Sequence, residues 1–241
     1  MNSIVVNLMQ VRERIELAAL AAKREPEDIE LLAVSKTFPA SAVEEAMHAG
    51  QSAFGENYVQ EAVEKIEKLS KLRPWLIWHF IGPLQSNKTR EVAQHFDWVH
   101  SVDRLKIAER LSTQRGEFPE LPPLQVCVQI NVSEEDSKSG ASLTEVEVLC
   151  NAISQLPNMV LRGLMAIPAP STDPNQQRQA FAAVRHCFQK IQAAHFADPG
   201  YQFFDTLSMG MSDDLEAAID EGSTIVRIGT AIFGKRDKIS K

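Results

Sequence analysis

The stretch IELLAVSKTFPASAVEEAMHAGQSAFGENY, residues 29–58, holds two short, mainly apolar runs on either side of a longer charged run. The short runs, 29–34 and 53–55, have the length and the apolar character of buried β-strands. The run between them, 40–49, is rich in Ala and Glu, which are compatible with a helix. A strand, a helix and a second strand in this order are typical of a βαβ unit, whose two strands are parallel.

The same alternation continues to the end of the chain. We expect strands at 29–34, 53–55, 77–81, 98–101, 124–132, 161–167, 206–209 and 224–228, and helical runs at 40–49, 58–72, 87–95, 104–114, 143–156, 176–195 and 213–220. Eight such units close naturally into a (β/α)8 TIM barrel, so we expect an α/β fold of this kind. A doubly wound open sheet is the alternative, but no dinucleotide-type GxGxxG motif follows the first strand.

The two ends of the chain complement each other. Apolar residues at helical spacing, among them Val5, Leu8 and Ile15, predict an extra helix before the first strand. After the last strand only residues 229–241 remain, too few for a full eighth helix, so we expect the leading helix to cover that gap. No linker-rich or low-complexity stretch divides the sequence, and we expect a single domain over residues 1–241.

Composition narrows the class of protein. The chain has 241 residues, 44% of them hydrophobic, and a formal net charge of -7. A chain of this length can bury a hydrophobic core without disulfides or structural metals. Its net negative charge argues against broad nucleic-acid binding. Charged residues interrupt the first 20 positions, as in Arg12–Glu16, and no apolar run is long enough for a bilayer span. We expect a cytoplasmic protein without membrane contact.

The three cysteines, Cys127, Cys150 and Cys187, fall in no CxxC or Cys/His metal spacing. We therefore expect buried, reduced thiols and no metal site. No HxH motif or pair of carboxylates falls at the strand ends either, which argues against metal-assisted hydrolysis.

The apolar run 31–34 is followed by Ser35 and then Lys36, at the carboxyl end of the first expected strand. Barrels carry their chemistry at this end of the strands, and an amine that is withdrawn from water there can condense with an aldehyde. On position alone, a lysine that reaches solvent is the more common arrangement.

Two later turns favour the reactive interpretation of Lys36 over the solvent-exposed one. TLSMGMSDD, residues 206–214, places Ser208 and Gly210 just before a helical run, and VRIGTAIFG, residues 226–234, places Gly229 and Thr230 after the last strand. Small residues allow close backbone approach, hydroxyls donate to phosphate oxygens, and barrels often bind phosphate after strands seven and eight. Each turn alone could be an ordinary helix cap or a tight loop.

Three further residues lie near the expected mouth, and each has a plain structural alternative. Asn57 could contact a ligand or cap the next helix. His79 could line the barrel interior or be a satisfied core residue. Met165 could pack on a flat ring or belong to an ordinary core.

Seven ordered segments of this sequence are more specific than any single residue: AVSKTFPA, FGENYVQE, WHFIGPLQSNK, SKSG, RGLMAIP, LSMGMSDD and VRIGTAIFG. They resemble the pyridoxal phosphate homeostasis protein family from about Leu31 to Gly234. The resemblance implies the barrel domain of alanine racemase without the second, β-rich domain of that enzyme. It further implies that pyridoxal 5′-phosphate is bound as a Schiff base on Lys36.

The resemblance also assigns roles to the other candidates. Arg227 matches the arginine that faces the pyridine nitrogen, while Ser208, Gly229 and Thr230 match phosphate contacts. The remaining matched positions lie in the phosphate turn or in segments that line the pocket: Gly210, Met211, Asn57, His79 and Met165. Phe38 departs from relatives that carry a basic residue there, so we expect no auxiliary lysine at that position.

The same features favour a carrier over an enzyme. An arginine beside the pyridine nitrogen disfavours protonation of that nitrogen and so weakens the ring as an electron sink. The racemase takes its second base, a tyrosine, from the domain that is missing here, and this chain has only Tyr58 and Tyr201. We expect no catalytic residue and no robust turnover, a role in vitamin B6 homeostasis, apo forms of pyridoxal phosphate enzymes as partners, and a monomer.

Alternatives remain at this stage. A small amino-acid racemase would need a second acid or base at the free face of the cofactor. A class I aldolase-like barrel would use Lys36 without any cofactor and hold a sugar phosphate in the same turns. Lys138 is the most plausible secondary amine for pyridoxal phosphate, although a solvated loop lysine is the commoner case.

Overall fold

The computed structural model describes residues 3–132 and 139–234. The strands are β1 (Glu30–Val34), β2 (Ala53–Glu56), β3 (Ile77–Phe80), β4 (Trp98–Val102), β5 (Leu124–Ile130), β6 (Met159–Ala166), β7 (Thr206–Ser208) and β8 (Ile225–Ile228). The α-helices are α1 (Ile4–Ala21), α2 (Ala40–His48), α3 (Val59–Lys68), α4 (Thr89–His95), α5 (Leu105–Arg115), α6 (Val146–Ser154), α7 (Pro174–Ala194), α8 (Leu215–Asp220) and α9 (Thr230–Phe233). Short 3-10 turns are η1 (Pro26–Asp28), η2 (Ser70–Trp75), η3 (Ser86–Lys88) and η4 (Pro199–Tyr201).

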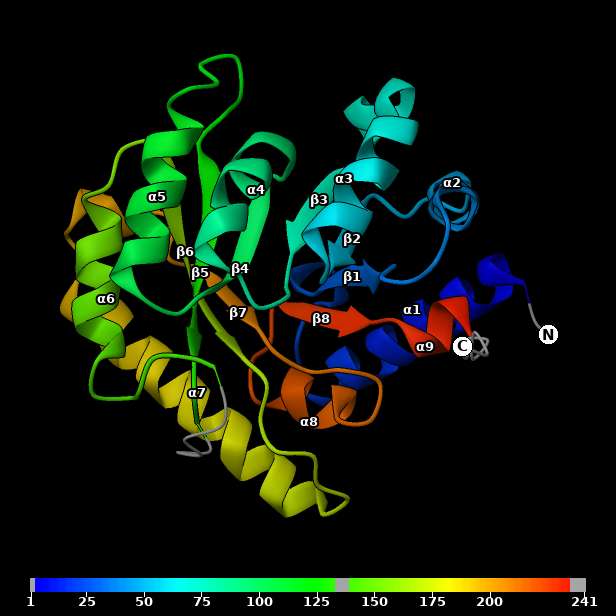
Figure 1. Ribbon diagram of the computed structural model, residues 1–241. Coiled ribbons are helices and arrows are strands. Elements are labelled where there is room, and N and C mark those ends of the chain that lie inside the picture. The colour runs from blue at the N-terminus through cyan, green and yellow to red at the C-terminus, as the bar shows by residue number, and fades with distance from the viewer. Residues whose placement is uncertain (1–2, 133–138, 235–241) are drawn as a thin grey trace.

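The eight strands form one closed parallel barrel in chain order, and the helices surround it (Figure 1). β1 closes the ring by pairing with β8, with Glu30 opposite Ile225 and Ala33 opposite Ile228. The expected (β/α)8 barrel is confirmed and the open-sheet alternative is wrong, because the first and last strands pair and leave no sheet edge.

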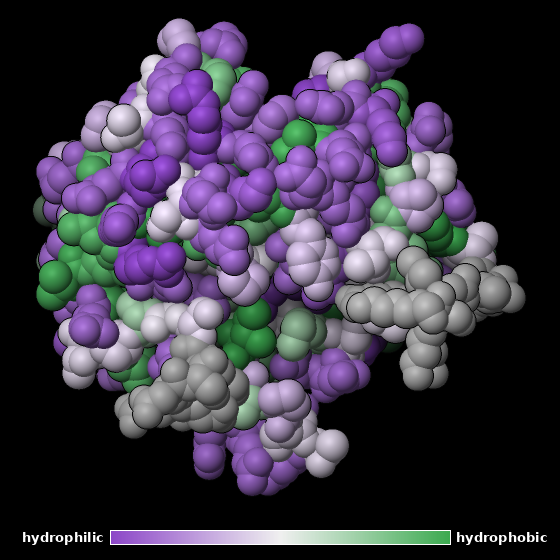
Figure 2. All heavy atoms as spheres, in the orientation of Figure 1, coloured by the Kyte–Doolittle hydropathy of each residue, from purple (hydrophilic) through white to green (hydrophobic). Residues whose placement is uncertain are grey.

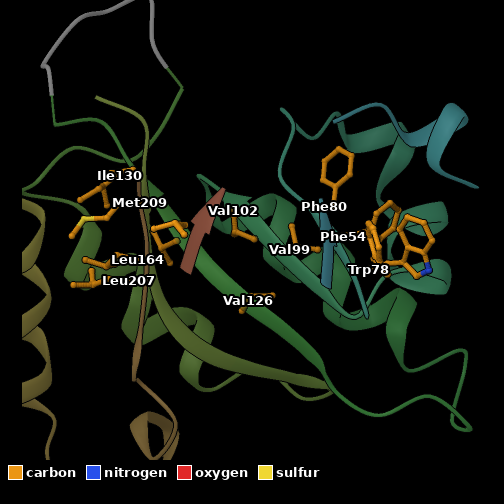
Figure 3. Close-up of a cluster of buried hydrophobic side chains, with 14 of the residues drawn as sticks. Phe54, Trp78, Phe80, Val99, Val102, Val126, Ile130, Leu164, Leu207 and Met209 are labelled. Atoms are coloured by element: carbon orange, nitrogen blue, oxygen red, sulfur yellow. The ribbon is translucent and has the colours of Figure 1, made fainter. Parts of the chain in front are cut away.

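Alternation along each strand separates two cores. On β1, Leu31 and Ala33 pack in the larger core between barrel and helices, whereas Leu32 and Val34 belong to the smaller core inside the barrel. Figure 3 shows part of the larger core, in which the ring centroids of Phe54 and Trp78 lie 5.8 Å apart.

The same period of two directs a set of mainly polar or sulfur-containing residues inward. Their neighbours on each strand, such as Trp78 and Phe80 on β3 or Val226 and Ile228 on β8, pack outward in the larger core. The intervening side chains therefore face the barrel interior. These are His79, His100, Cys127, Gln129, Met165, Ser208 and Arg227, all of them buried.

Helix α1 fills the gap in the outer helical layer that the short α9 leaves, as expected. It packs against α2, α8 and α9, and its buried face includes Leu8 and Ile15 (Figure 1). Asn7 Nδ2 donates to the Ile232 carbonyl at 2.7 Å, which ties α1 directly to the four-residue α9.

Two expected helical runs are shorter than predicted. The run 58–72 is α-helical only to Lys68 and continues as η2, where Pro74 lacks the N–H that a regular helix needs. The run 143–156 begins its helix at Val146, because Ser142 and Glu145 first form a turn held by a 2.7 Å side-chain hydrogen bond.

The surface in Figure 2 is mainly hydrophilic over the surrounding helices, with scattered hydrophobic residues. Across residues 3–132 and 139–234, no helix combines the length and the hydropathy needed to cross a bilayer.

Candidate functional site

A cavity of about 540 Å³ opens at the carboxyl ends of the strands. Its size falls in the range of ordinary small-molecule sites. It is lined by Val34, Lys36, Phe38, Asn57, Ile81, Ile167, Met211, Ser212, Asp213, Arg227, Gly229, Thr230 and Ala231.

Lys36 lies in a tight turn after β1. The Phe38 N–H donates to the Ser35 carbonyl at 3.1 Å, and Thr37 has a φ of 69°. A hydrogen bond of this span with positive φ at the third residue is typical of a type II turn, which favours glycine at that place. A β-branched residue there stores about 1–3 kcal/mol of backbone strain.

A buried ion-pair network surrounds this turn. The Lys65 side chain, 3% exposed, lies 2.5 Å from Glu56 and 3.2 Å from Glu61. Lys65 also donates to the Ser35 carbonyl at 2.8 Å, and Glu61 accepts the Thr37 N–H at 2.5 Å. Burial raises the pKa of Glu56, and the neighbouring Lys65 opposes that rise.

Arg227 enters the cavity from β8 with its guanidinium buried. Nη1 donates to the Ser208 carbonyl at 2.6 Å and to Ser208 Oγ at 2.8 Å, and Nη2 donates to the Ala166 carbonyl at 2.9 Å. Burial lowers the pKa of Arg227 to about 10, so the group is still a cation at neutral pH. A guanidinium has five N–H groups, and these contacts leave donors for an acceptor on a ligand.

A hydrogen-bonded chain runs from Arg227 into the barrel. Ser208 Oγ lies 2.8 Å from His100 Nδ1, and His100 Nε2 lies 2.9 Å from His79 Nδ1. Because Arg227 can only donate, the simplest assignment has Ser208 donating to His100 and His100 donating to His79. The Ser208 hydroxyl is thus engaged inside the barrel.

His79 and His100, the two histidines of this hydrogen-bonded chain, are neutral. Burial lowers the pKa of His79 to about 3 and lowers that of His100 well below its usual value, with a further lowering from His79 and Arg227. Arg227 is therefore the charged group among these four hydrogen-bonded residues.

Backbone turns make another part of the cavity wall. Gly229 and Thr230 stand where β8 passes into α9, and the first N–H groups of a helix have no acceptor within it. A Cβ on Gly229 would come within 3.1 Å of the Val34 carbonyl, so β1 and β8 approach closely here only because residue 229 is small. Met211 and Ser212 continue the same wall from the β7 turn.

Asn57 supplies an unsatisfied polar atom. Its Oδ1 is buried and has no hydrogen-bond partner among the described residues, although the residue lines the cavity. A buried amide without a partner is costly, and a bound ligand would satisfy it. The absence of a side chain at Gly82 allows the backbone of Asn57 to approach closely, because a Cβ at residue 82 would lie 2.1 Å from the Asn57 carbonyl oxygen.

The predicted residues fall into two groups. Six of them line the cavity: Lys36, Asn57, Met211, Arg227, Gly229 and Thr230. Four others do not line it: His79, Met165 and Ser208 lie in the barrel interior, and Gly210 lies in the β7 turn with its α-carbon against Ala218. Lys138 lies outside the described residues.

Sequence reasoning did not single out several residues of the site. Ile81, Ile167 and Asp213 lie at expected strand ends or helix starts, so position could have suggested them. His100 and Lys65 belong to neighbouring elements, and their contacts depend on long-range packing. Phe38 lines the cavity and packs on Phe233, with ring centroids 5.1 Å apart.

These groups fit a flat, phosphate-bearing aromatic aldehyde. The wall offers an amine at Lys36, a buried cation at Arg227, backbone N–H groups at Thr230 and an unsatisfied amide at Asn57. Within the described ranges, no cluster of His, Cys, Asp or Glu side chains could hold a metal ion.

A larger depression of about 1370 Å³ adjoins the cavity and shares Asn57, Ile81 and Met211 with it. Residues of the loop before α7, such as Pro170 and Thr172, form its far wall. Among the described residues, the cavity therefore adjoins a broad depression at the barrel mouth.

Comparison with known proteins gives long matches. Residues 6–237 match the family described as "Alanine racemase, N-terminal domain". The pyridoxal phosphate homeostasis protein of Escherichia coli (strain K12) is 55% identical over 242 residues, which is 100% of both chains. The protein of the same name from Pseudomonas aeruginosa is 56% identical and covers 98% of this chain and 97% of its own.

Solved structures agree with this result. PipY of Synechococcus elongatus PCC7942, solved with PLP bound, has a TM-score of 0.83 and 37% identity, over 96% of this chain and 100% of that one. Alanine racemase from Corynebacterium glutamicum shares the fold at a TM-score of 0.67 and 16% identity, and the match covers 61% of the enzyme. The chain belongs to the alanine racemase N-terminal domain family and, within it, to the pyridoxal phosphate homeostasis proteins.

Proposed function

We propose that this chain binds pyridoxal 5′-phosphate in the cavity at the carboxyl ends of the strands and holds it as a Schiff base on Lys36. We further propose that it takes part in the homeostasis of pyridoxal 5′-phosphate without robust turnover. The observation that carries the proposal is that Lys36 and Arg227 line one cavity, with the Gly229–Thr230 turn on its wall. The names of the relatives and the ligand bound to PipY support the same assignment.

Each group has a role that follows from its chemistry. The Lys36 amine would bond the aldehyde carbon, Arg227 would donate to the ring nitrogen, and the Thr230 turn would hold the phosphate. Asn57 would turn its amide toward a ring substituent. When bound, the cofactor supplies an electron sink, but bases and orientation have to come from the protein.

The side chains of the cavity argue against efficient proton transfer. Its titratable residues, among those the structure describes, are Lys36, Asp213 and Arg227. Tyr201 is buried at η4 with its hydroxyl on Asn151, and Tyr58 is 54% exposed and does not line the cavity. The open mouth also admits water, which hinders carbanion chemistry.

One observation keeps a racemase as the second candidate. Asp213 places a carboxylate on the cavity wall, where it could serve as the second base. If so, the Lys36 and Asp213 side chains would act on opposite faces of a substrate, and Asp213→Asn would abolish racemisation.

Binding is tested with the purified chain and pyridoxal 5′-phosphate. We expect a visible absorption band and, after borohydride reduction and proteolysis, a labelled peptide that contains Lys36. Lys36→Ala should lose both signals, whereas Lys68→Ala, an exposed lysine on α3, should keep them. Equal labelling of Lys36→Ala and the wild type would contradict the proposal, and a persistently colourless wild type would favour the aldolase-like alternative.

Turnover is tested on the loaded protein with single-enantiomer alanine or serine, followed by optical rotation. We expect no sustained change. Racemisation that disappears in both Lys36→Ala and Asp213→Asn would replace the carrier by the racemase.

The remaining proposals concern the protein as a whole. We infer a single domain over residues 1–241, a monomer, a cytoplasmic location, and apo forms of pyridoxal phosphate enzymes as recipients. Loss of the visible band together with gain of activity in an added apo-enzyme supports delivery, and sedimentation velocity measures the oligomeric state.

A further inference from the structure

The turn that carries Lys36 is held from both sides by side chains of other elements. Lys65 Nζ on α3 donates to the Ser35 carbonyl at 2.8 Å, and the Ser35 hydroxyl donates to Glu56 Oε1 at 2.7 Å. On the other side, Glu61 Oε1 accepts the Thr37 N–H at 2.5 Å. The residues directly before and after Lys36 are therefore both fixed to one network.

The network is itself closed by two ion pairs. Lys65 lies 2.5 Å from Glu56 and 3.2 Å from Glu61, and the side chains of Lys65 and Glu56 are 3% and 0% exposed. Buried ion pairs contribute little net stability, because each charge loses its hydration. Apolar residues of similar volume would pack this place equally well, so stability alone does not explain the network.

Backbone conformation explains why the turn needs such support. Thr37 has a φ of 69°, a value that β-branched residues rarely adopt. A glycine would take this conformation without strain, but the chain has Thr37, whose N–H is held by Glu61. Outliers of this kind persist where the surrounding structure determines them, and they gather at functional sites.

We propose that Glu56, Glu61 and Lys65 are positioning residues for Lys36. By fixing Ser35 and Thr37 they hold the turn in the conformation that directs the Lys36 side chain into the cavity, and so they set the rate at which its amine captures an aldehyde. This inference rests on the proposed function of Lys36. Glu56, Glu61 and Lys65 do not line the cavity, so they would act through residues 35–37.

The test compares three variants of α3. Glu61→Ala removes the acceptor of the Thr37 N–H, Glu61→Gln keeps an oxygen at that place, and Glu64→Ala removes an exposed carboxylate one turn away. The Glu61 side chain is 33% exposed, so these changes leave the core of the barrel intact.

The measurement is the rate at which pyridoxal 5′-phosphate becomes trappable by borohydride on the Lys36 peptide. We expect Glu61→Ala to slow capture about tenfold, as for a lost hydrogen bond to a charged acceptor. Glu61→Gln should restore the rate to within about twofold of the wild type, and Glu64→Ala should match it. Thermal melting by circular dichroism is followed alongside and should differ little among the three variants.

Two results would overturn the positioning role: a Glu61→Ala rate equal to that of the wild type, or a Glu61→Gln rate as slow as that of Glu61→Ala. The second would assign the effect to charge and not to backbone geometry. Failure of the wild type to label at Lys36 is a different result, because it contradicts the proposed function itself.

Discussion

At the scale of single residues, the site depends on how the fold treats Arg227. Its cation is buried against two carbonyls and one hydroxyl, with no carboxylate in direct hydrogen-bond contact among the described residues. Burying a charge without a directly bonded charged partner is costly, although the nearby Asp214 favours the charged form of Arg227. The spare guanidinium donors are best explained by an acceptor that arrives with a ligand.

Thr230 offers a direct test of the phosphate side. Thr230→Ala removes one hydroxyl donor and should weaken retention of pyridoxal 5′-phosphate by about 1–3 kcal/mol, as for a hydrogen bond to a charged group. Because Thr230 is exposed, the free energy of unfolding should change by no more than about 0.5 kcal/mol. Equilibrium dialysis measures retention, with Thr230→Ser as the control that keeps the hydroxyl. Equal retention by all three proteins would remove Thr230 from the phosphate contacts.

At the scale of elements, β6 contains one of the irregularities in strand register. The register with β5 shifts between Leu161 and Gly163, which leaves Arg162 as the extra residue of a bulge. Gly163 has a φ of 151°, and a Cβ there would lie 1.9 Å from the Thr206 carbonyl oxygen. Gly163→Ala should therefore push β6 and β7 apart.

We expect Gly163→Ala to lower the free energy of unfolding by about 3 kcal/mol or more. Gly50→Ala is the matched control, because Gly50 also has positive φ but its Cβ would meet only the Arg12 guanidinium, 3.8 Å away. That change should cost about 1 kcal/mol through backbone strain alone. Urea denaturation compares the two, and similar losses would show that the Thr206 clash is relieved elsewhere.

The histidines of β3 and β4 make the barrel sensitive to acid. The pKa of His79 is about 3 in the folded chain and that of His100 is also lowered, whereas an unfolded histidine titrates near its ordinary value of about 6.5. Between these values the unfolded state binds more protons, so stability is lost as pH falls from about 6.5 toward about 3. The raised pKa of Glu56 acts in the opposite direction.

Denaturation at pH 7, 6, 5 and 4 measures this loss as a falling free energy of unfolding. A double variant, His79→Gln with His100→Gln, keeps hydrogen-bonding groups without titrating and should flatten the decline. A decline of the same steepness in both proteins would place the acid sensitivity in other groups.

Much of the element pattern could be predicted from local sequence. The alternation of short apolar runs with longer charged runs is a short-range signal, and it led to the barrel. The position of Lys36 and the small residues after β7 and β8 pointed to the cavity, and the family resemblance added Arg227 and Met211. The contact of Lys65 with Ser35 and the chain through His100 could not be predicted, since they join residues that are 30 and 108 positions apart and meet only through tertiary packing. His79 shows the same limit, because the sequence places it in a strand but does not show how far from the cavity its side chain lies.

At the scale of the whole molecule, α1 completes the outer layer that the short α9 leaves open. Leu8 is fully buried between these parts, while Met9 beside it is 64% exposed. Leu8→Ala should lower the free energy of unfolding by about 2–5 kcal/mol, whereas Met9→Ala should change it by about 0.5 kcal/mol at most. Thermal or urea unfolding of the pair measures how strongly α1 is coupled to the barrel, and equal stability of the two variants would show that α1 is only loosely attached.

The pairing of β1 with β8 also sets an order of events during synthesis. Lys36 leaves the ribosome with the first strand, but Arg227 and Thr230 arrive with the last. Until then the nascent chain has Lys36 but lacks the part of the cavity that β8 contributes. An aldehyde should therefore react with Lys36 no faster than with any other exposed amine. Under the proposed function, selective capture would therefore need the finished chain, and a ribosome-bound chain that stops before β8 should show no preference for Lys36.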